Sequence, residues 1–184
     1  NTVIVFTADH GVAPMVEANQ ARKMPGKRPD AAQIYKIVEN AISARFGEGK
    51  WIEAKAEYGF YFNRKLMEER QASEEEVERI AAKAIEGHPA MFRVYTKSQL
   101  AEGRLPMDRF NTRVLNGFFP QRGPDMLAIQ KPYFLMDKTG TTHGLPFSYD
   151  THVPVIFMGP MIKPGRYHKA AMVNDIAPTL ATLL

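Results

Sequence analysis

An unbroken apolar run, Val3 to Phe6, lies near the start of the chain and is followed at once by Thr7-Ala8-Asp9-His10-Gly11. Consecutive β-branched and aromatic residues are typical of a strand that is buried on both faces, as in the middle of a parallel sheet. In open α/β folds, ligands bind beyond the carboxyl ends of such strands. The pattern therefore predicts a buried strand whose far end presents Asp9 and His10 to a ligand.

The two residues at this strand end suit a divalent metal ion. A carboxylate beside an imidazole offers two metal ligands, and Gly11 allows the backbone to turn sharply next to them. The alternative is that Asp9 caps the following segment and His10 is an ordinary polar residue. A zinc site takes about four ligands, so the triplet alone does not decide between these interpretations.

The composition excludes several classes of protein. The 184 residues carry 24 basic and 20 acidic side chains, for a net charge of +4, and the two signs are interspersed. This pattern does not favour a nucleic-acid polymer as partner. The chain has no cysteine, which excludes disulfides and cysteine-ligated zinc. No apolar run approaches the roughly 18–20 residues of a membrane helix, so no membrane segment is expected.

The segment after the triplet is predicted to be a loop followed by a helix. Residues 12–29 are rich in Pro, Lys and Arg, and the densest basic stretch, 22–28, is interpreted as a solvated loop. Its alternative role is to attract an anionic substrate. Asp30 is a predicted N-cap and Gly47 a predicted stop for the helix, which is expected to pack on the first strand.

Residues 51–130 change character and mix short strands with helices. The predicted elements are strands at 51–56, 58–63, 91–95 and 125–129, and helices that follow Ser73, cover 97–101 and run from 107 to 116. Such a mixture with short connections is typical of a small α+β unit. The aromatic residues Tyr58, Phe60, Tyr61 and Phe62 are interpreted as its core and rim, the alternative being a surface that stacks on a base or sugar.

Together these elements predict an α/β protein whose mostly parallel sheet is flanked by helices. Residues 1–50 and 131–184 are expected to form this sheet and its helices, with residues 51–130 inserted as an α+β subdomain. Because Asn1 lies directly before a strand, the chain is expected to be a piece of a longer protein. The sequence leaves the oligomeric state open.

A polar, glycine-bearing loop near the end of the chain holds two histidines, His143 and His152. The loop spans residues 139–152 and leads into an apolar strand at 153–159. If that strand shares a sheet with the first one, His143 can add an imidazole to the ligands of the early triplet. Such a set suits a hydrolase that activates a hydroxyl by metal coordination.

Three motifs occur in order along the chain: Thr7 to Gly11, His143 to Phe157, and Asp175 to Leu180. In this order they resemble the C-terminal half of the alkaline phosphatase superfamily. The closest branch is the bacterial alkaline phosphatases related to type I phosphodiesterases and nucleotide pyrophosphatases. The resemblance covers both ends of the chain well and the middle only by layout.

The resemblance implies a hydrolase of small phosphate esters that uses two zinc ions and a phospho-enzyme. Asp9 and His10 would bind the metal that activates the nucleophile, and His143 the other metal, with His152 as the rival for that role. The nucleophile and the remaining ligands are expected upstream of Asn1, so this fragment is expected to be inactive alone. The resemblance also implies a bacterial periplasmic or secreted protein.

Other readings of the same residues stay open. A phosphodiesterase, a nucleotide pyrophosphatase or a sulfatase can be built on the same scaffold. From a different class, the chain can be a non-catalytic α/β binding domain whose Asp-His pair is structural.

Overall fold

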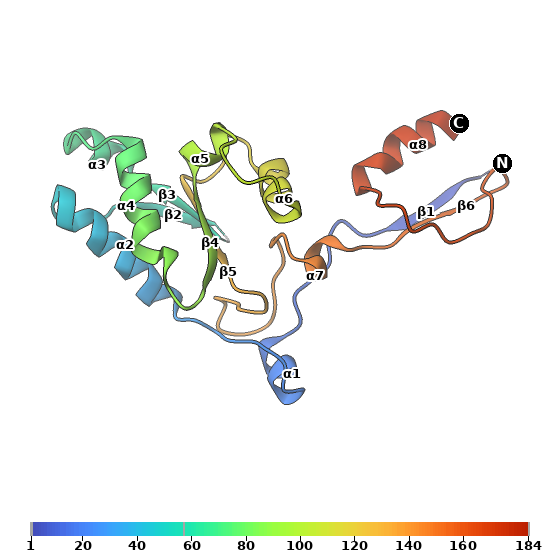
Figure 1. Cartoon of the computed structure of the whole chain (residues 1–184), viewed down its shortest axis with the longest axis horizontal. Helices are drawn as coiled ribbons and strands as arrows, with labels where there is room; N and C mark the ends of the chain where they lie inside the picture. The colour runs from blue at the N-terminus through green and yellow to red at the C-terminus, as the bar shows by residue number, and fades with distance from the viewer. Residues whose placement is uncertain (1, 57, 184) are drawn as a thin grey trace.

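The chain folds into two separate sheets joined by loops, as Figure 1 shows for the computed structural model. The structure describes residues 2–56 and 58–183. The strands are β1 (Ile4–Thr7), β2 (Ile52–Ala56), β3 (Gly59–Phe62), β4 (Met91–Thr96), β5 (Met126–Gln130) and β6 (Val155–Met158). The helices are α1 (Val16–Ala21), α2 (Ala31–Phe46), α3 (Arg64–Glu69), α4 (Glu74–Glu86), α5 (Lys97–Ala101), α6 (Arg109–Gly117), α7 (Ser148–Thr151), the short 3-10 helix η1 (Val173–Asp175) and α8 (Ile176–Leu183). None of these described helices is long and apolar enough to cross a membrane.

Strand β1 pairs with β6 in a two-stranded antiparallel ribbon that extends away from the rest of the chain (Figure 1). The register places Ile4 opposite Met158 and Phe6 opposite Ile156. Because side chains alternate between the faces of a strand, these four share one face, and Ile4 and Phe6 are 52% and 61% exposed. The expectation that this strand is buried on both faces of a parallel sheet is therefore wrong. An apolar run specifies a strand but not which neighbours cover it.

The second sheet has the strand order β2-β3-β5-β4, and all of its described pairs are antiparallel. Strand β2 ends at Ala56 and β3 begins at Gly59, and so short a connection joins only antiparallel strands. The predicted α/β class is confirmed. The described strand pairing differs from the mostly parallel sheet that the order of elements suggests, because β3 and β4 both pair antiparallel with β5 and β1 pairs antiparallel with β6. An isolated parallel bridge joins Lys27 and Phe134.

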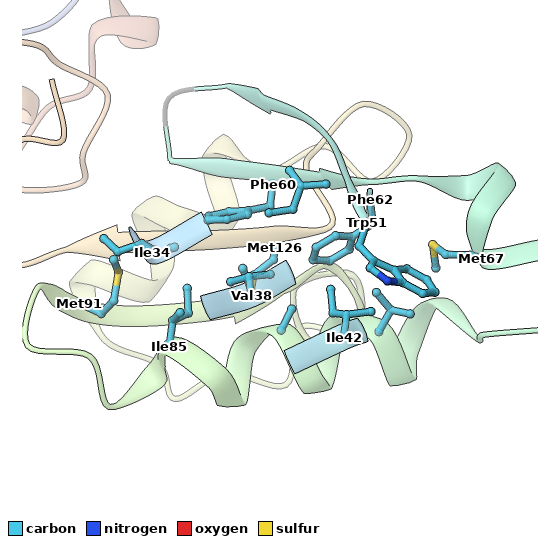
Figure 2. Packing of buried hydrophobic residues seen from close by; sticks show 14 of the residues in the cluster. Ile34, Val38, Ile42, Trp51, Phe60, Phe62, Met67, Ile85, Met91 and Met126 are labelled. Carbon is cyan, nitrogen blue, oxygen red and sulfur yellow. The ribbon is translucent and has the colours of Figure 1, made fainter. Parts of the chain in front are cut away.

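The main core lies between the four-stranded sheet and the helices α2 and α4. Figure 2 shows buried side chains from both helices and from the strands packed in one layer, among them Ile34, Val38, Ile42, Trp51, Phe60, Phe62, Ile85 and Met126. Helix α2 therefore packs on this sheet and on α4, and not on β1 as the sequence suggests. The division at residues 50 and 131 stays a prediction.

The ends of the longer helices follow local sequence signals. Asp30 caps α2, with its carboxylate accepting hydrogen bonds from the N–H groups of Ala32 and Gln33, and Gly47 ends the helix with a φ of 91°. Ser73 caps α4 in the same manner. Three short helices, α1, α3 and α7, lie in segments where no helix is predicted.

Candidate functional site

Two loops that are distant in sequence meet beyond the end of β1. The rings of His10 and His143 stack with 3.6 Å between their centroids and 10° between their planes. The N–H of Gly11 donates to the carbonyl oxygen of Asp150 at 2.7 Å, which ties the early triplet to the first turn of α7. The structure therefore brings His10 and His143 into direct contact.

Gly11 is the point of closest approach between the two loops. A Cβ atom at this position would lie 2.0 Å from the carbonyl oxygen of Tyr149 and 3.3 Å from the Cα of Asp150, whereas ordinary contact begins at 3.4 Å. No side chain fits there without separating the loops. The glycine of the triplet is thus required by this backbone contact.

The side chains of Asp9 and His10 are placed to share one cation. Asp9 Oδ2 lies 3.6 Å from His10 Nε2, close to the ~3.4 Å between two ligands of one tetrahedral zinc ion that each lie about 2.1 Å from it. His10 Nδ1 lies 2.7 Å from the carbonyl oxygen of Gly11. Because a carbonyl only accepts, this bond puts the ring proton on Nδ1 and leaves the Nε2 lone pair for a metal. The two side chains fit one part of a metal site.

The backbone of His143 is held by a tyrosine from the neighbouring sheet. Tyr58, next to the start of β3, donates its hydroxyl to the carbonyl oxygen of His143 at 3.1 Å, and Tyr58 itself is only 7% exposed. A buried aromatic ring with a polar tip is well suited to fix such a loop. The position of the histidine loop thus depends on residues 51–130.

An arginine clamp fixes the approach to the same loop. Arg28 donates to the carbonyl oxygens of Asp137 and Gly140 at 2.6 and 2.7 Å. The same guanidinium binds both carboxylate oxygens of Glu17 at 2.6 and 2.9 Å. Its hydrogen bond lowers the pKa of Glu17 to about 2. The basic loop predicted at residues 22–28 therefore contributes this arginine to a structural contact.

Asp150 is a buried carboxylate near the two histidines. It is only 4% exposed, and its Oδ2 accepts the N–H of Leu145 at 2.8 Å. Its Oδ1 has no hydrogen-bond partner among the described residues. Burial raises the pKa of Asp150, and the N–H of Leu145 and the nearby His143 and His10 act in the opposite direction. A buried carboxylate with a free oxygen is suited to hold an imidazole N–H.

A cavity of about 560 Å³ opens beside this site. Its lining includes Asp9, His10 and Asp150, residues of the loop after His143, and residues of the four-stranded sheet and α6. The volume is within the range of about 300–1,000 Å³ that holds small-molecule ligands. The arrangement offers metal ligands next to a space large enough for a substrate.

The structure separates the two late histidines. His143 contacts His10, whereas His152 is exposed at the end of α7. Among the residues that the structure describes, no group of three or more His, Asp or Glu side chains is arranged to hold a metal. The stacked histidines and Asp9 would therefore need further ligands to complete a metal site.

Sequence reasoning assigned no role at the site to Asp150, Tyr58 or Arg113. Asp150 lies inside the motif that carries the resemblance, so a signal for it was present. The aromatic cluster predicts Tyr58 as core or rim of its subdomain, and Arg113 carries no local signal because its contact with the histidine loop is tertiary. Phe60 and Phe62 are buried in the core, and Tyr61 lies half-buried at the cavity.

The chain is similar to curated bacterial proteins over nearly all of its residues. It is 32% identical to the alkaline phosphatase PafA of Elizabethkingia meningoseptica, with 100% of this chain and 34% of that protein aligned. It is 29% identical to a protein of Myroides odoratus named calcium-transporting ATPase, with 100% and 34% aligned. It is 28% identical to the alkaline phosphatase PhoK of Sphingomonas sp, with 99% and 35% aligned. No family model matches the sequence.

The fold is similar to a solved structure as well. The crystal structure of wild-type PafA matches with a TM-score of 0.87 and 32% identity, covering 99% of this chain and 35% of that one. The resemblance to part of an alkaline phosphatase is therefore confirmed in sequence and in fold. The chain spans about a third of the length of the curated relatives it matches.

Proposed function

Because this chain is alkaline-phosphatase-like along its whole length, we propose that it forms part of a metal-dependent phosphoric monoester hydrolase. The proposal depends on the contact between His10 and His143, whose ring centroids lie 3.6 Å apart, because this contact brings together the two motifs that would supply metal ligands. We propose zinc as the metal and small phosphate esters as the substrates. A metal ion bound there would activate an oxygen nucleophile and neutralise charge on the phosphate.

The residues of this chain would bind and orient in that reaction. Asp9 Oδ2 and His10 Nε2 would hold one ion, and His143 would hold the second, with His152 as the less favoured ligand. Asp150 and the Gly11 carbonyl would fix the imidazoles from behind, as carboxylates and carbonyls do around metal-bound histidines. A serine or threonine nucleophile, which would form the phospho-enzyme, is expected outside this chain, so residues 1–184 alone should release no phosphate.

The proposal is tested by metal content and by paired histidine variants of the longer protein. We expect about two zinc ions per chain by elemental analysis. His143→Ala should lower kcat/KM for an aryl phosphate at least ~100-fold, because even partners of metal ligands typically cost about 10–100-fold. The control is His88→Ala, since the ring of His88 accepts a hydrogen bond from the N–H of Ala90 at 3.2 Å and lies in neither of the two histidine-bearing motifs. Equal losses in the two variants would refute the ligand assignment.

Two alternatives predict different results in the same experiments. A phosphodiesterase, nucleotide pyrophosphatase or sulfatase would contain the metals but prefer a diester, a nucleotide or a sulfate ester. A non-catalytic binding domain would contain no zinc and hydrolyse none of these substrates. The exposed Asp9 and the free Nε2 of His10 favour the metal site over a purely structural pair.

We also propose a periplasmic or secreted location, supported by the resemblance alone. Cell fractionation of the native source with an antibody against this chain tests the location. Recovery in the cytoplasmic fraction would refute it.

A further inference from the structure

The cavity beside the stacked histidines has two chemically different sides. The side at the end of β1 carries the ionisable groups Asp9, His10 and Asp150. A second part of the lining, here called the wall, comes from the four-stranded sheet with the adjoining Tyr58 and from α6, and it includes Tyr58, Tyr61, Arg113, Gly117, Leu127 and Ile129. Apart from one guanidinium and the two tyrosine hydroxyls, the groups named here are aromatic rings, aliphatic side chains and a glycine backbone. A ligand in the cavity would therefore meet charge at one end and an apolar surface at the other.

The cavity is larger than a phosphate group requires. A phosphate has about five heavy atoms. If each atom is given the roughly 30 Å³ that a water molecule occupies in the liquid, the phosphate would fill about 150 Å³. The cavity measures about 560 Å³. Most of the space is therefore left for whatever group the phosphate is attached to.

We propose that the wall formed by the sheet and α6 is the subsite for the leaving group, and that it selects phosphate monoesters of planar aromatic alcohols. The proposal rests on the function proposed above and names its substrate class. Tyr61 is half-buried and offers a ring on which an aromatic group can stack. Leu127 and Ile129 supply apolar surface that a small alkyl group would leave uncovered.

Arg113 connects this wall to the histidine loop. Its guanidinium donates to the carbonyl oxygen of Pro146 at 2.9 Å, three residues beyond His143. The contact ties α6, which supplies part of the wall, to the loop of the proposed ligand His143. The planar cation can also stack on an aromatic leaving group and attract the anionic ester. Arg113 thus joins the wall to the loop that carries His143.

Gly117 allows the subsite to be filled without disturbing the backbone. It is the last residue of α6, it lines the cavity, and a Cβ at this position would meet no described atom within 4 Å. A Gly117→Leu side chain would occupy the space assigned to the leaving group. The matched control is Gly87→Leu, because Gly87 also follows a helix, has an ordinary φ of −85° and is equally open, but does not line the cavity.

The experiment compares kcat/KM for 2-naphthyl phosphate and methyl phosphate in the longer protein. Gly117→Leu should lower the ratio of the two at least ~10-fold, in the range that pocket fit is worth in other enzymes. Gly87→Leu should leave the ratio unchanged. An unchanged ratio in Gly117→Leu would overturn the subsite while leaving the proposed function intact. A wild-type protein that hydrolyses neither ester would overturn the proposed function, and the subsite with it.

A second variant keeps the test decisive if Gly117→Leu does not fold. Tyr61→Ala removes a half-buried ring from the same wall, so it creates space and causes no clash. It should lower the same ratio at least ~3-fold, because the aromatic stacking partner is lost. A ratio equal to that of the wild type in a folded Tyr61→Ala protein would overturn the subsite as well.

Discussion

Replacing Gly11 with alanine tests the contact on which the site is built. The added Cβ would lie 2.0 Å from the Tyr149 carbonyl oxygen, where ordinary contact begins at 3.4 Å, so the loops must separate by about 1.4 Å. The obstructing atom belongs to the backbone of α7, which cannot rotate away as a side chain can. The 2.7 Å hydrogen bond from Gly11 to Asp150 would be lost by the same movement.

The expected cost has two parts. Forcing an extra methyl group into a packed contact typically costs about 1–3 kcal/mol, and the lost hydrogen bond about 1 kcal/mol. We therefore expect Gly11→Ala to lower the free energy of unfolding by about 2–4 kcal/mol. In the longer protein, kcat/KM should fall on the order of 100-fold, because a displacement of about 1 Å at catalytic groups can cost that much.

The assays are urea unfolding, phosphatase activity and proton NMR of the histidine rings. Stacked rings shift each other's resonances upfield, so the signals of His10 and His143 should move downfield when the loops part. The control is Gly87→Ala, where the new Cβ meets no described atom within 4 Å. A Gly11→Ala protein as stable and active as this control, with unchanged histidine resonances, would show that the loops do not meet as described.

Three further changes probe the surroundings of the site. Tyr58→Phe removes the hydroxyl that binds the His143 carbonyl, and urea unfolding should show a loss of about 1 kcal/mol; no loss would mean that this bond does not hold the loop. The hydrogen bond from Arg28 lowers the pKa of Glu17 in the folded chain to about 2. Below pH 4.5 the unfolded chain therefore binds more protons than the folded chain, and the stability should fall as the pH drops from 4.5 to 2. Glu17→Gln should flatten that slope, and an identical slope would contradict the clamp. Burial raises the pKa of Asp150 above 3.8, so its contribution has the opposite sign: in the metal-free chain, stability should fall as the pH rises from 3.8, and Asp150→Asn should reduce that fall.

Local signals predict the longer helices α2 and α4 but not the short helices α1, α3 and α7. The caps at Asp30 and Ser73 act on N–H groups two or three residues away, so the sequence around each cap contains the whole interaction. The pairing of β1 is not a local interaction of this sort, because its partner β6 begins about 150 residues later in the chain. Nothing in the run from Val3 to Phe6 indicates a strand that arrives from so far away, or its direction.

In the candidate site, too, local motifs predict some of the residues, whereas others are placed there only by tertiary contacts. The motifs predict Asp9, His10 and His143 as metal ligands, because they carry the resemblance in order along the chain, and this assignment stays a prediction. The wall of the cavity does not appear in any motif. Arg113 reaches Pro146 across 33 residues, and Tyr58 reaches His143 across 85, so only the folded arrangement of α6 and β3 places them at the site.

The ribbon of β1 and β6 has a practical consequence for anyone who prepares this chain. Within the described residues the small sheet ends at these two strands, so their outer edges keep unpaired backbone groups beside an exposed apolar face. Unpaired strand edges can form hydrogen bonds with strands of other molecules, and exposed apolar patches associate with one another. Solutions of residues 1–184 should therefore become turbid with rising concentration, and a charged residue in place of Phe6 should keep them clear.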